Sequence, residues 1–163
     1  GIRDNMAVLN SDLSLVGIVV NTSDNFSQVM SLLHVKNNVN AIMKRSGNAG
    51  TISWDGKSPL YLTMTGIPKS DSIARGDTVL TGTYSLSFPP LRIIGTVASI
   101  IKDNSSSFYI LQIKTEANFQ NLQHVVLLVQ GRLFLSFRQH QRRYFWAKIF
   151  RYNSFHGKHY KKF

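Results

Sequence analysis

No cysteine occurs among the 163 residues, so the chain can form neither a disulfide framework nor a metal site built on thiolates. Long apolar runs are missing as well. No stretch reaches the roughly 18 consecutive apolar residues of a membrane-spanning helix. The sequence begins with glycine and has no leader in which a basic segment precedes an apolar one. We therefore expect Gly1 to be an internal position of a longer protein or a processed start.

Acidic residues are few and unevenly placed. Residues 1–130 carry 10 Lys and Arg against 8 Asp and Glu, whereas residues 131–163 carry 9 Lys and Arg and no acid. The net charges of the two parts are therefore +2 and +9. The second part also holds ten of the 18 aromatic residues. An argument from charge for binding to nucleic acid or to a membrane thus applies only to residues 131–163.

The residue patterns of common catalytic sites are absent from residues 1–130. His34 and His124 are the only histidines there, Glu116 is the only glutamate, and no Gly-x-Ser-x-Gly motif of a nucleophilic serine occurs. No His-x-x-x-His motif or cluster of acids suggests a metal. Gly47 and Gly50 are not followed by the Lys-Ser/Thr of a phosphate-binding loop. We predict that the chain is not an enzyme and holds neither a cofactor nor a metal.

The sequence is rich in the signals of β structure. Short runs of β-branched residues alternate with clusters of Asn, Asp, Gly and Ser, a pattern typical of strands and turns. Ten such runs in about 130 residues predict an all-β fold made of small barrels or a sandwich. They are residues 6–10, 15–23, 27–34, 39–47, 49–56, 60–67, 77–82, 93–103, 107–117 and 124–129.

An internal repeat indicates how these strands are organised. Residues 7–33 and 78–113 both read as a strand, a polar loop, a strand with an internal glycine, a hairpin and a strand. Val8-Leu9 aligns with Val79-Leu80, and the second copy has the longer loop. The repeat predicts two β-barrel subdomains of similar topology. We place them at residues 1–67 and 68–130, followed by a basic aromatic tail at 131–163.

Four segments occur in an order typical of one known family. They are "GIRDNMAVLNSDLSLVGIVV" (1–20), Arg45-Ser46-Gly47 with Gly50-Thr51-Ile52, "IARGDTVLTG" (73–82) and "FPPLRIIGTVASIIKD" (88–103). Through them, residues 1–129 resemble the extracytoplasmic β-domain of the MreC family of rod shape-determining proteins. The sequence departs from that pattern at Asn5, Ser14 and Leu91, where the family has glycine.

The resemblance implies two small β-barrels that normally follow an N-terminal membrane helix and a coiled coil, both outside this chain. It also implies a non-catalytic scaffold on the extracytoplasmic (periplasmic) face of the bacterial cytoplasmic membrane. Proteins of this family self-associate and bind a class B penicillin-binding protein, together with other membrane proteins of the elongation complex that directs peptidoglycan synthesis. We therefore expect a homo-oligomer with these partners and regard nucleic acid as an unfavoured one.

Arg75-Gly76-Asp77 spells a tripeptide found in cell-adhesion ligands. A strand follows it at once, and Gly76 and Asp77 match the Gly-Asp turn of the family. Glycine can supply a positive φ at such a turn, and aspartate can accept hydrogen bonds from nearby backbone amides. We predict a structural turn rather than a ligand.

Four further glycines are expected to be structural. Gly17 and Gly95 lie inside strands, where a bulge, a close backbone approach or a sharp barrel corner is the usual reason for glycine. Gly47 and Gly50 belong to the family-like segment between two strands.

The loop "TYSLSFPPLR" (83–92) is the best candidate for a partner interface. It concentrates Tyr84, Phe88, Pro89 and Leu91, and aromatic and apolar side chains in a loop can anchor a partner. The same residues could instead cap the end of a barrel.

The tail admits three interpretations. Its interleaved basic and aromatic residues are typical of binding to nucleic acid or to an anionic membrane. A helix over residues 138–152 would be amphipathic, as an interfacial segment or a partner-binding segment requires. The abrupt loss of acids and of family resemblance after residue 129 also fits a shifted reading frame or an engineered remnant.

Overall fold

The computed structural model describes residues 2–23, 26–84, 88–101, 105–129 and 132–138, the last stretch in its backbone only. These residues form eleven strands, and no helix occurs among them. The all-β prediction is confirmed. The helix expected over residues 138–152, and with it most of the basic tail, lies outside the described residues.

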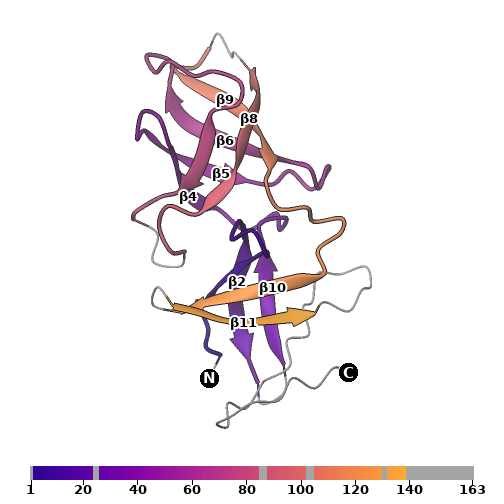
Figure 1. Ribbon diagram of the computed structural model, residues 1–163. Coiled ribbons are helices and arrows are strands. Elements are labelled where there is room, and N and C mark those ends of the chain that lie inside the picture. Colours follow the sequence, from indigo (N-terminus) through magenta and orange to yellow (C-terminus); the bar gives the residue numbers. More distant parts are fainter. Residues whose placement is uncertain (1, 24–25, 85–87, 102–104, 130–131, 139–163) are drawn as a thin grey trace.

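Six strands close into an antiparallel barrel, which occupies the upper half of Figure 1. Their order around the barrel is β4-β5-β6-β9-β8-β7, with β7 paired to β4. Closure leaves no free edge in this part of the molecule. The strands are β4 (Val39–Met43), β5 (Ala49–Ser53), β6 (Tyr61–Pro68), β7 (Thr78–Thr81), β8 (Ile93–Ile101) and β9 (Phe108–Thr115).

Five strands form a second, open sheet below the barrel in the order β11-β10-β1-β2-β3. In Figure 1, β10 and β11 run across β2. All neighbouring pairs are antiparallel. The strands are β1 (Ala7–Leu9), β2 (Leu15–Thr22), β3 (Ser27–Ser31), β10 (His124–Val129) and β11 (Arg132–Arg138).

The two sheets do not follow the predicted division at residues 67 and 68. The barrel takes β4 to β6 from one side of that point and β7 to β9 from the other. The open sheet recruits β10 from the end of the second range to pair with β1 near the start of the chain. The first residues of the tail form β11, which pairs with β10. The division fails because the hydrogen bonds that complete each sheet join segments far apart in sequence, which local patterns do not reveal.

The predicted repeat is confirmed by the strand pairing. The first unit, β1–β2–β3, and the second unit, β7–β8–β9, are both antiparallel three-strand units. Val8 pairs with Gly17, Val79 pairs with Gly95, and the register shifts directly after each of these valines. The pairing with the third strand shifts again beyond each glycine. The two units therefore share their bulges as well as their strand order.

Gly17 and Gly95 are required by a close approach of backbone. A Cβ at Gly17 would overlap the carbonyl oxygen of Met30 on β3, and a Cβ at Gly95 would overlap the carbonyl oxygen of Lys114 on β9. Neither oxygen can move aside without displacing its strand, since both belong to the main chain. The close backbone approach considered for these glycines is therefore what the structure shows.

Two clusters of buried apolar side chains stabilise the two sheets. The first fills the barrel and continues onto one face of the open sheet, and the second lies on the other face of that sheet. Alternation along β3 and β4, with every second residue buried, produces this arrangement. The largest fully buried side chains are Leu9, Leu15, Leu32, Met43, Ile52, Leu62, Met64, Ile67, Ile94, Leu111, Ile113 and Leu127.

Candidate partner interface

The connection between β7 and β8 carries the four predicted interface residues, and the structure separates them. Tyr84 is 88% exposed and Leu91 is 58% exposed, whereas Phe88 is 5% exposed. Pro89 is half-buried. Phe88 belongs to the cluster inside the barrel, so it anchors the loop and is not available at the surface. The prediction of Phe88 as a surface contact is wrong, because its ring packs inward.

Thr81, at the end of β7, fixes the shape of this loop. Its hydroxyl donates to the carbonyl oxygen of Pro89 over 2.6 Å and accepts from the backbone N–H of Arg92 over 2.8 Å. The N–H of Leu91 donates to the carbonyl oxygen of Thr81 over 3.1 Å. Thr81 is fully buried, so these bonds are shielded from water. These bonds tie residues 89–92, at the C-terminal end of the loop, to the end of β7.

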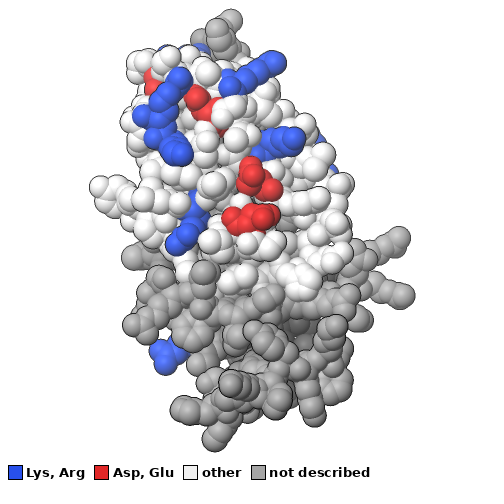
Figure 2. All heavy atoms as spheres, viewed as in Figure 1, with Lys and Arg blue, Asp and Glu red and all other residues white. Residues whose placement is uncertain are grey.

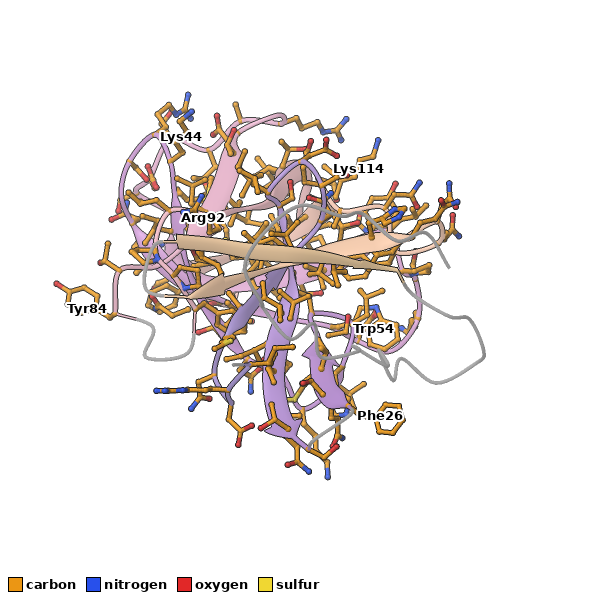
Figure 3. The ribbon with its side chains drawn as sticks, turned by 60° about the horizontal axis from the view of Figure 1, so that its bottom comes forward. Phe26, Lys44, Trp54, Tyr84, Arg92 and Lys114 are labelled. Carbon is orange, nitrogen blue, oxygen red and sulfur yellow. The ribbon has the colours of Figure 1, made fainter. Side chains whose placement is uncertain are left out.

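The exposed apolar side chains of this connection form what we call the barrel-end patch, comprising Tyr84, Leu91 and Ile93. Ile93, at the start of β8, is 40% exposed. Figure 3 shows the Tyr84 side chain reaching away from the strands. Exposed aromatic and branched aliphatic side chains on a constrained loop are typical of contact surfaces for other proteins. Sequence patterns identified Tyr84 and Leu91 but not Ile93, which reads as an ordinary strand residue.

Charges of both signs are interspersed on the face of the barrel seen in Figure 2. No patch of a single sign is apparent on the described part of that face, as expected from a net charge of +2 over residues 1–130. Steering of a partner by a strong field of one sign is therefore not expected from this part of the surface.

Arg75-Gly76-Asp77 forms the predicted structural turn. Gly76 has a φ of +88°, which glycine adopts without strain, and its N–H donates to the carbonyl oxygen of Val97. The Asp77 carboxylate accepts from the N–H of Ala74 over 2.8 Å and from the Arg45 guanidinium over 2.9 Å. Its side chain is only 14% exposed. Asp77 is thus engaged within the fold, as the turn requires.

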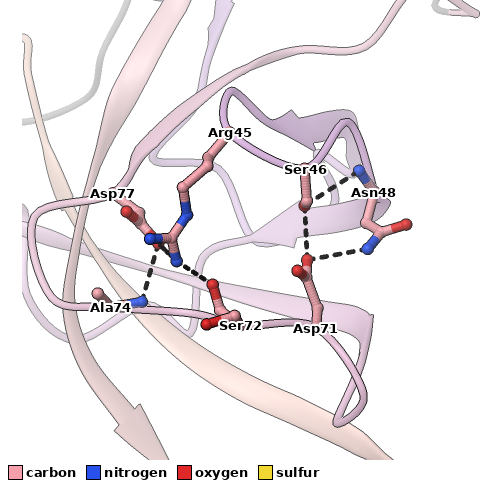
Figure 4. A network of polar contacts seen from close by, with 7 residues as sticks. All are labelled: Arg45, Ser46, Asn48, Asp71, Ser72, Ala74 and Asp77. Atoms are coloured by element: carbon pink, nitrogen blue, oxygen red, sulfur yellow. Dashed lines mark hydrogen bonds and ion pairs between the residues drawn. The ribbon is translucent and has the colours of Figure 1, made fainter.

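Asp77 is one half of a polar network that we call the loop clamp. It joins the β4–β5 turn, through Arg45, Ser46 and Asn48, to the β6–β7 loop, through Asp71 and Asp77 (Figure 4). The Arg45 guanidinium also donates to the carbonyl oxygen of Ser72 in that loop. Sequence analysis singled out Arg45, Ser46 and Asp77 in separate motifs, but it found neither Asp71 nor the pairing between segments more than 20 residues apart.

Asp71 accepts two side-chain hydrogen bonds in the loop clamp. The Ser46 hydroxyl donates over 2.5 Å and the Asn48 amide over 2.9 Å. These two bonds, with the Ser46 bond the stronger influence, hold the pKa of Asp71 below its ordinary value of 3.8. Gly47 sits between the two donors with a φ of +75°, so the turn can present both to one carboxylate. Gly50 lies further along, and a Cβ there would meet the carbonyl oxygen of Thr65 at 2.5 Å.

The described residues contain no group of three or more His, Cys, Asp or Glu side chains placed to hold a metal ion. His34 lies in the loop after β3, where its Nδ1 accepts from the N–H of Lys36 over 3.2 Å. The part of the chain that the structure describes contains no helix that is long and apolar enough to cross a membrane.

The chain is similar to known proteins in both sequence and fold. Residues 1–129 match the family described as rod shape-determining protein MreC, barrel core. The chain belongs to the MreC family. The match spans both sheets, from before β1 to the end of β10, and so includes the barrel-end patch and the loop clamp.

Solved structures of the family share the fold. MreC from Pseudomonas aeruginosa is 21% identical with a TM-score of 0.73, and the alignment covers 79% of this chain and 82% of that one. MreC from Listeria monocytogenes is 27% identical with a TM-score of 0.72, covering 81% of this chain and 64% of that one. A Helicobacter pylori MreC in complex with penicillin-binding protein PBP2 is 20% identical with a TM-score of 0.58, covering 78% and 80%. No curated protein sequence matches the chain.

Proposed function

We propose that this chain is the barrel core of a non-catalytic scaffold that organises peptidoglycan synthesis during elongation of rod-shaped bacteria. The observation that carries the proposal is the family match over residues 1–129, on a fold of the same architecture. A periplasmic location on the outer side of the cytoplasmic membrane is part of the proposal. It is supported by a structural relative described as the major periplasmic domain of MreC, 18% identical with a TM-score of 0.60.

The proposed partner is a class B penicillin-binding protein. The complex of the Helicobacter pylori relative with PBP2 supports this choice. Self-association, contacts with other membrane proteins of the elongation complex and anchoring through a segment upstream of Gly1 belong to the same proposal.

The barrel-end patch is the contact surface that we assign to the penicillin-binding protein. Tyr84 presents a large amphipathic ring, and Leu91 and Ile93 offer further apolar area on the same connection. Residues 88–92 are held by the burial of Phe88 and by the hydrogen bonds of Thr81, so Leu91 loses little freedom when a partner binds. Such preorganisation favours binding through a few dominant side chains.

Titration calorimetry with the ectodomain of a class B penicillin-binding protein tests this assignment. Tyr84→Ala and Leu91→Ala should each weaken binding about tenfold or more, because dominant interface residues contribute upwards of about 1.4 kcal/mol. Phe108→Ala is the matched control, since Phe108 is 48% exposed on a different part of the barrel and should leave the affinity unchanged. Unchanged binding by both patch variants would refute the surface. Absence of binding by the unaltered chain would refute the partner.

A further inference from the structure

Arg92 lies between two members of the barrel-end patch, because Leu91 precedes it in the chain and Ile93 follows it. Neighbouring Cα atoms are about 3.8 Å apart, so the Arg92 side chain starts inside this surface or at its border. Figure 3 shows Arg92 and Tyr84 in the same half of the view and Trp54 in the other half. A cation therefore accompanies the exposed apolar side chains of this connection.

The backbone of Arg92 is fixed on both sides by Thr81. The N–H of Arg92 donates to the Thr81 hydroxyl over 2.8 Å, and its carbonyl oxygen accepts from the Thr81 N–H over 2.8 Å. Thr81 is fully buried, so water does not compete for these bonds. The Arg92 side chain thus leaves the barrel from a defined position, and only its own rotamers have to be fixed when a partner binds.

The Arg92 side chain is half-buried, whereas the other arginines with described side chains are exposed. Among the non-exposed side chains that the structure describes, two polar atoms are shielded from solvent and have no hydrogen-bond partner, Arg92 Nε and Asn40 Oδ1. The terminal nitrogens of Arg92 are not among these shielded atoms. The stem of the side chain is therefore packed against the protein, and the end of the guanidinium reaches solvent.

No acidic side chain in the described part of the chain forms an ion pair with Arg92. The backbone of Glu116 is bonded to Ile94, two residues from Arg92, but its carboxylate does not pair with the guanidinium. A partly desolvated cation with an unbonded N–H is unfavourable for a fold. The stability of the barrel consequently gives no reason for an arginine at this position.

We propose that Arg92 binds a carboxylate of the penicillin-binding protein through the terminal nitrogens of its guanidinium. The inference rests on the proposed function and adds the chemistry of the partner's surface, which is an acidic group within an apolar contact. A guanidinium matches a carboxylate with two parallel N–H donors. The apolar side chains of the barrel-end patch exclude water around the pair and so strengthen it. A partner without the carboxylate leaves the guanidinium desolvated and unpaired, so Arg92 selects among partners.

Substitution of Arg92 tests this assignment by titration calorimetry with the ectodomain of a class B penicillin-binding protein, at low and high salt. Arg92→Met keeps an unbranched apolar stem but removes the charge and the N–H donors, so the affinity should fall about tenfold or more. The affinity of the unaltered chain should weaken as salt is raised, whereas that of Arg92→Met should change less. Arg92→Lys keeps the charge without the planar pair of donors, and its affinity should lie between the two.

Urea unfolding of the same variants separates binding from stability. Because Arg92 has a shielded N–H without a partner and no counterion, Arg92→Met should unfold at the same urea midpoint as the unaltered chain or at a higher one. Arg75→Met is the matched control, since it removes the same charge from an exposed position in the turn before β7. This control should leave the affinity unchanged.

The outcomes distinguish the role of Arg92 from the choice of partner. Three results would each overturn the role of Arg92 and leave the partner in place. They are unchanged affinity in Arg92→Met, a loss of affinity that is accompanied by a lower urea midpoint, and an equal loss of affinity in Arg75→Met. Absence of binding by the unaltered chain would overturn the partner and the proposed carboxylate pair together.

Discussion

The first and second units are the same three-strand element in two settings. The second unit is enclosed in a ring, with β4 beside β7 and β6 beside β9, whereas the first has β10 on one side and no described strand on the other. Their strand pairing and bulges nevertheless coincide. The shared geometry therefore arises within the unit, from its glycines and its alternation, and not from closure of the barrel.

The loops that join the first two strands of each unit are also closed in the same way. Asn10 in the first unit and Thr81 in the second occupy the same position, and each side chain holds its loop. Asn10 Oδ1 accepts from the N–H groups of Asp12 and Ser14, much as Thr81 binds Pro89 and Arg92. Both loops are thus closed by a side chain at the same position, and the second unit has extra residues inserted within its loop. Insertions at such places are tolerated, and they can acquire a binding role.

The strongest test of the comparison replaces the glycine common to both units. Gly95→Ala should lower the free energy of unfolding by about 3 kcal/mol, because its Cβ would overlap main chain on a strand fixed on both sides. Gly17→Ala should cost less, about 2 kcal/mol, since no described strand is hydrogen-bonded to the other side of β3 and β3 can shift more easily than β9. Gly47→Ala is the control at about 1 kcal/mol, as nothing lies within 4 Å and only its positive φ is unfavourable. Urea unfolding gives all three values, and equal losses at Gly17 and Gly95 would contradict the role of closure.

Asn10 and Thr81 should contribute about equally to the free energy of unfolding, but only Thr81 should affect binding of the partner. Thr81→Val removes two buried hydrogen bonds and should cost about 2 kcal/mol, as should Asn10→Ala. Only Thr81→Val should also weaken binding of the penicillin-binding protein, because only that loop carries the barrel-end patch. Thr81→Ser keeps the hydroxyl and is the control for both measurements, by denaturant unfolding and calorimetry. Equal loss of binding in Asn10→Ala would show that general destabilisation explains the effect.

The sequence predicted the strands better than their partners. Runs of β-branched residues between clusters of turn-forming residues located every strand from β1 to β10, because strand and turn preferences leave a local signature. It did not reveal that β6 pairs with β9 or β1 with β10, since hydrogen bonding between distant segments leaves no mark in either segment alone. β11 was hidden in a basic aromatic stretch that reads as a tail.

The candidate site was predictable only in outline. Aromatic and proline residues marked the loop that carries the patch, but composition does not say which side chain turns inward. The burial of Phe88 and the exposure of Tyr84 depend on how the loop is tied to Thr81, which only the fold reveals. The loop clamp was missed for the same reason, because its donors and acceptors come from different loops.

Two leucines in the left-handed region provide a finer comparison. Leu13 and Leu91 precede the second strand of their units with φ values of +62° and +61°. Leu91→Gly should raise the free energy of unfolding by about 0.5 kcal/mol, because relief of strain outweighs the added freedom of the unfolded chain. Leu13→Gly should lower it by about 1 kcal/mol, since Leu13 also packs against the core. Thermal and urea unfolding should show opposite signs, and a loss in both would mean that Leu91 contributes packing that its exposure does not suggest.

The smallest expected effect concerns the loop clamp, which adjoins the start of the second unit. Asp77 is anchored there by Arg45, whereas Met6 takes the equivalent position in the first unit and packs into an apolar cluster. The hydrogen bonds from Ser46 and Asn48 lower the pKa of Asp71 in the folded state, so folding favours the ionised carboxyl. The stabilisation is present above the unfolded pKa of about 4 and is lost as the pH falls through the lower folded pKa.

Ser46→Ala removes the largest cause of that shift, so its destabilisation should be greatest near neutral pH and should fade below about pH 4. Ser72→Ala is the matched control in the same loop, because Ser72 contributes to the clamp through its backbone. Urea midpoints measured from neutral to acidic pH should converge for Ser46→Ala and the unaltered chain, while the control remains parallel. A difference that stays constant with pH would mean that Ser46 stabilises the turn without acting on Asp71. The loop clamp would then stabilise the fold independently of pH, as the packing of Met6 does in the first unit.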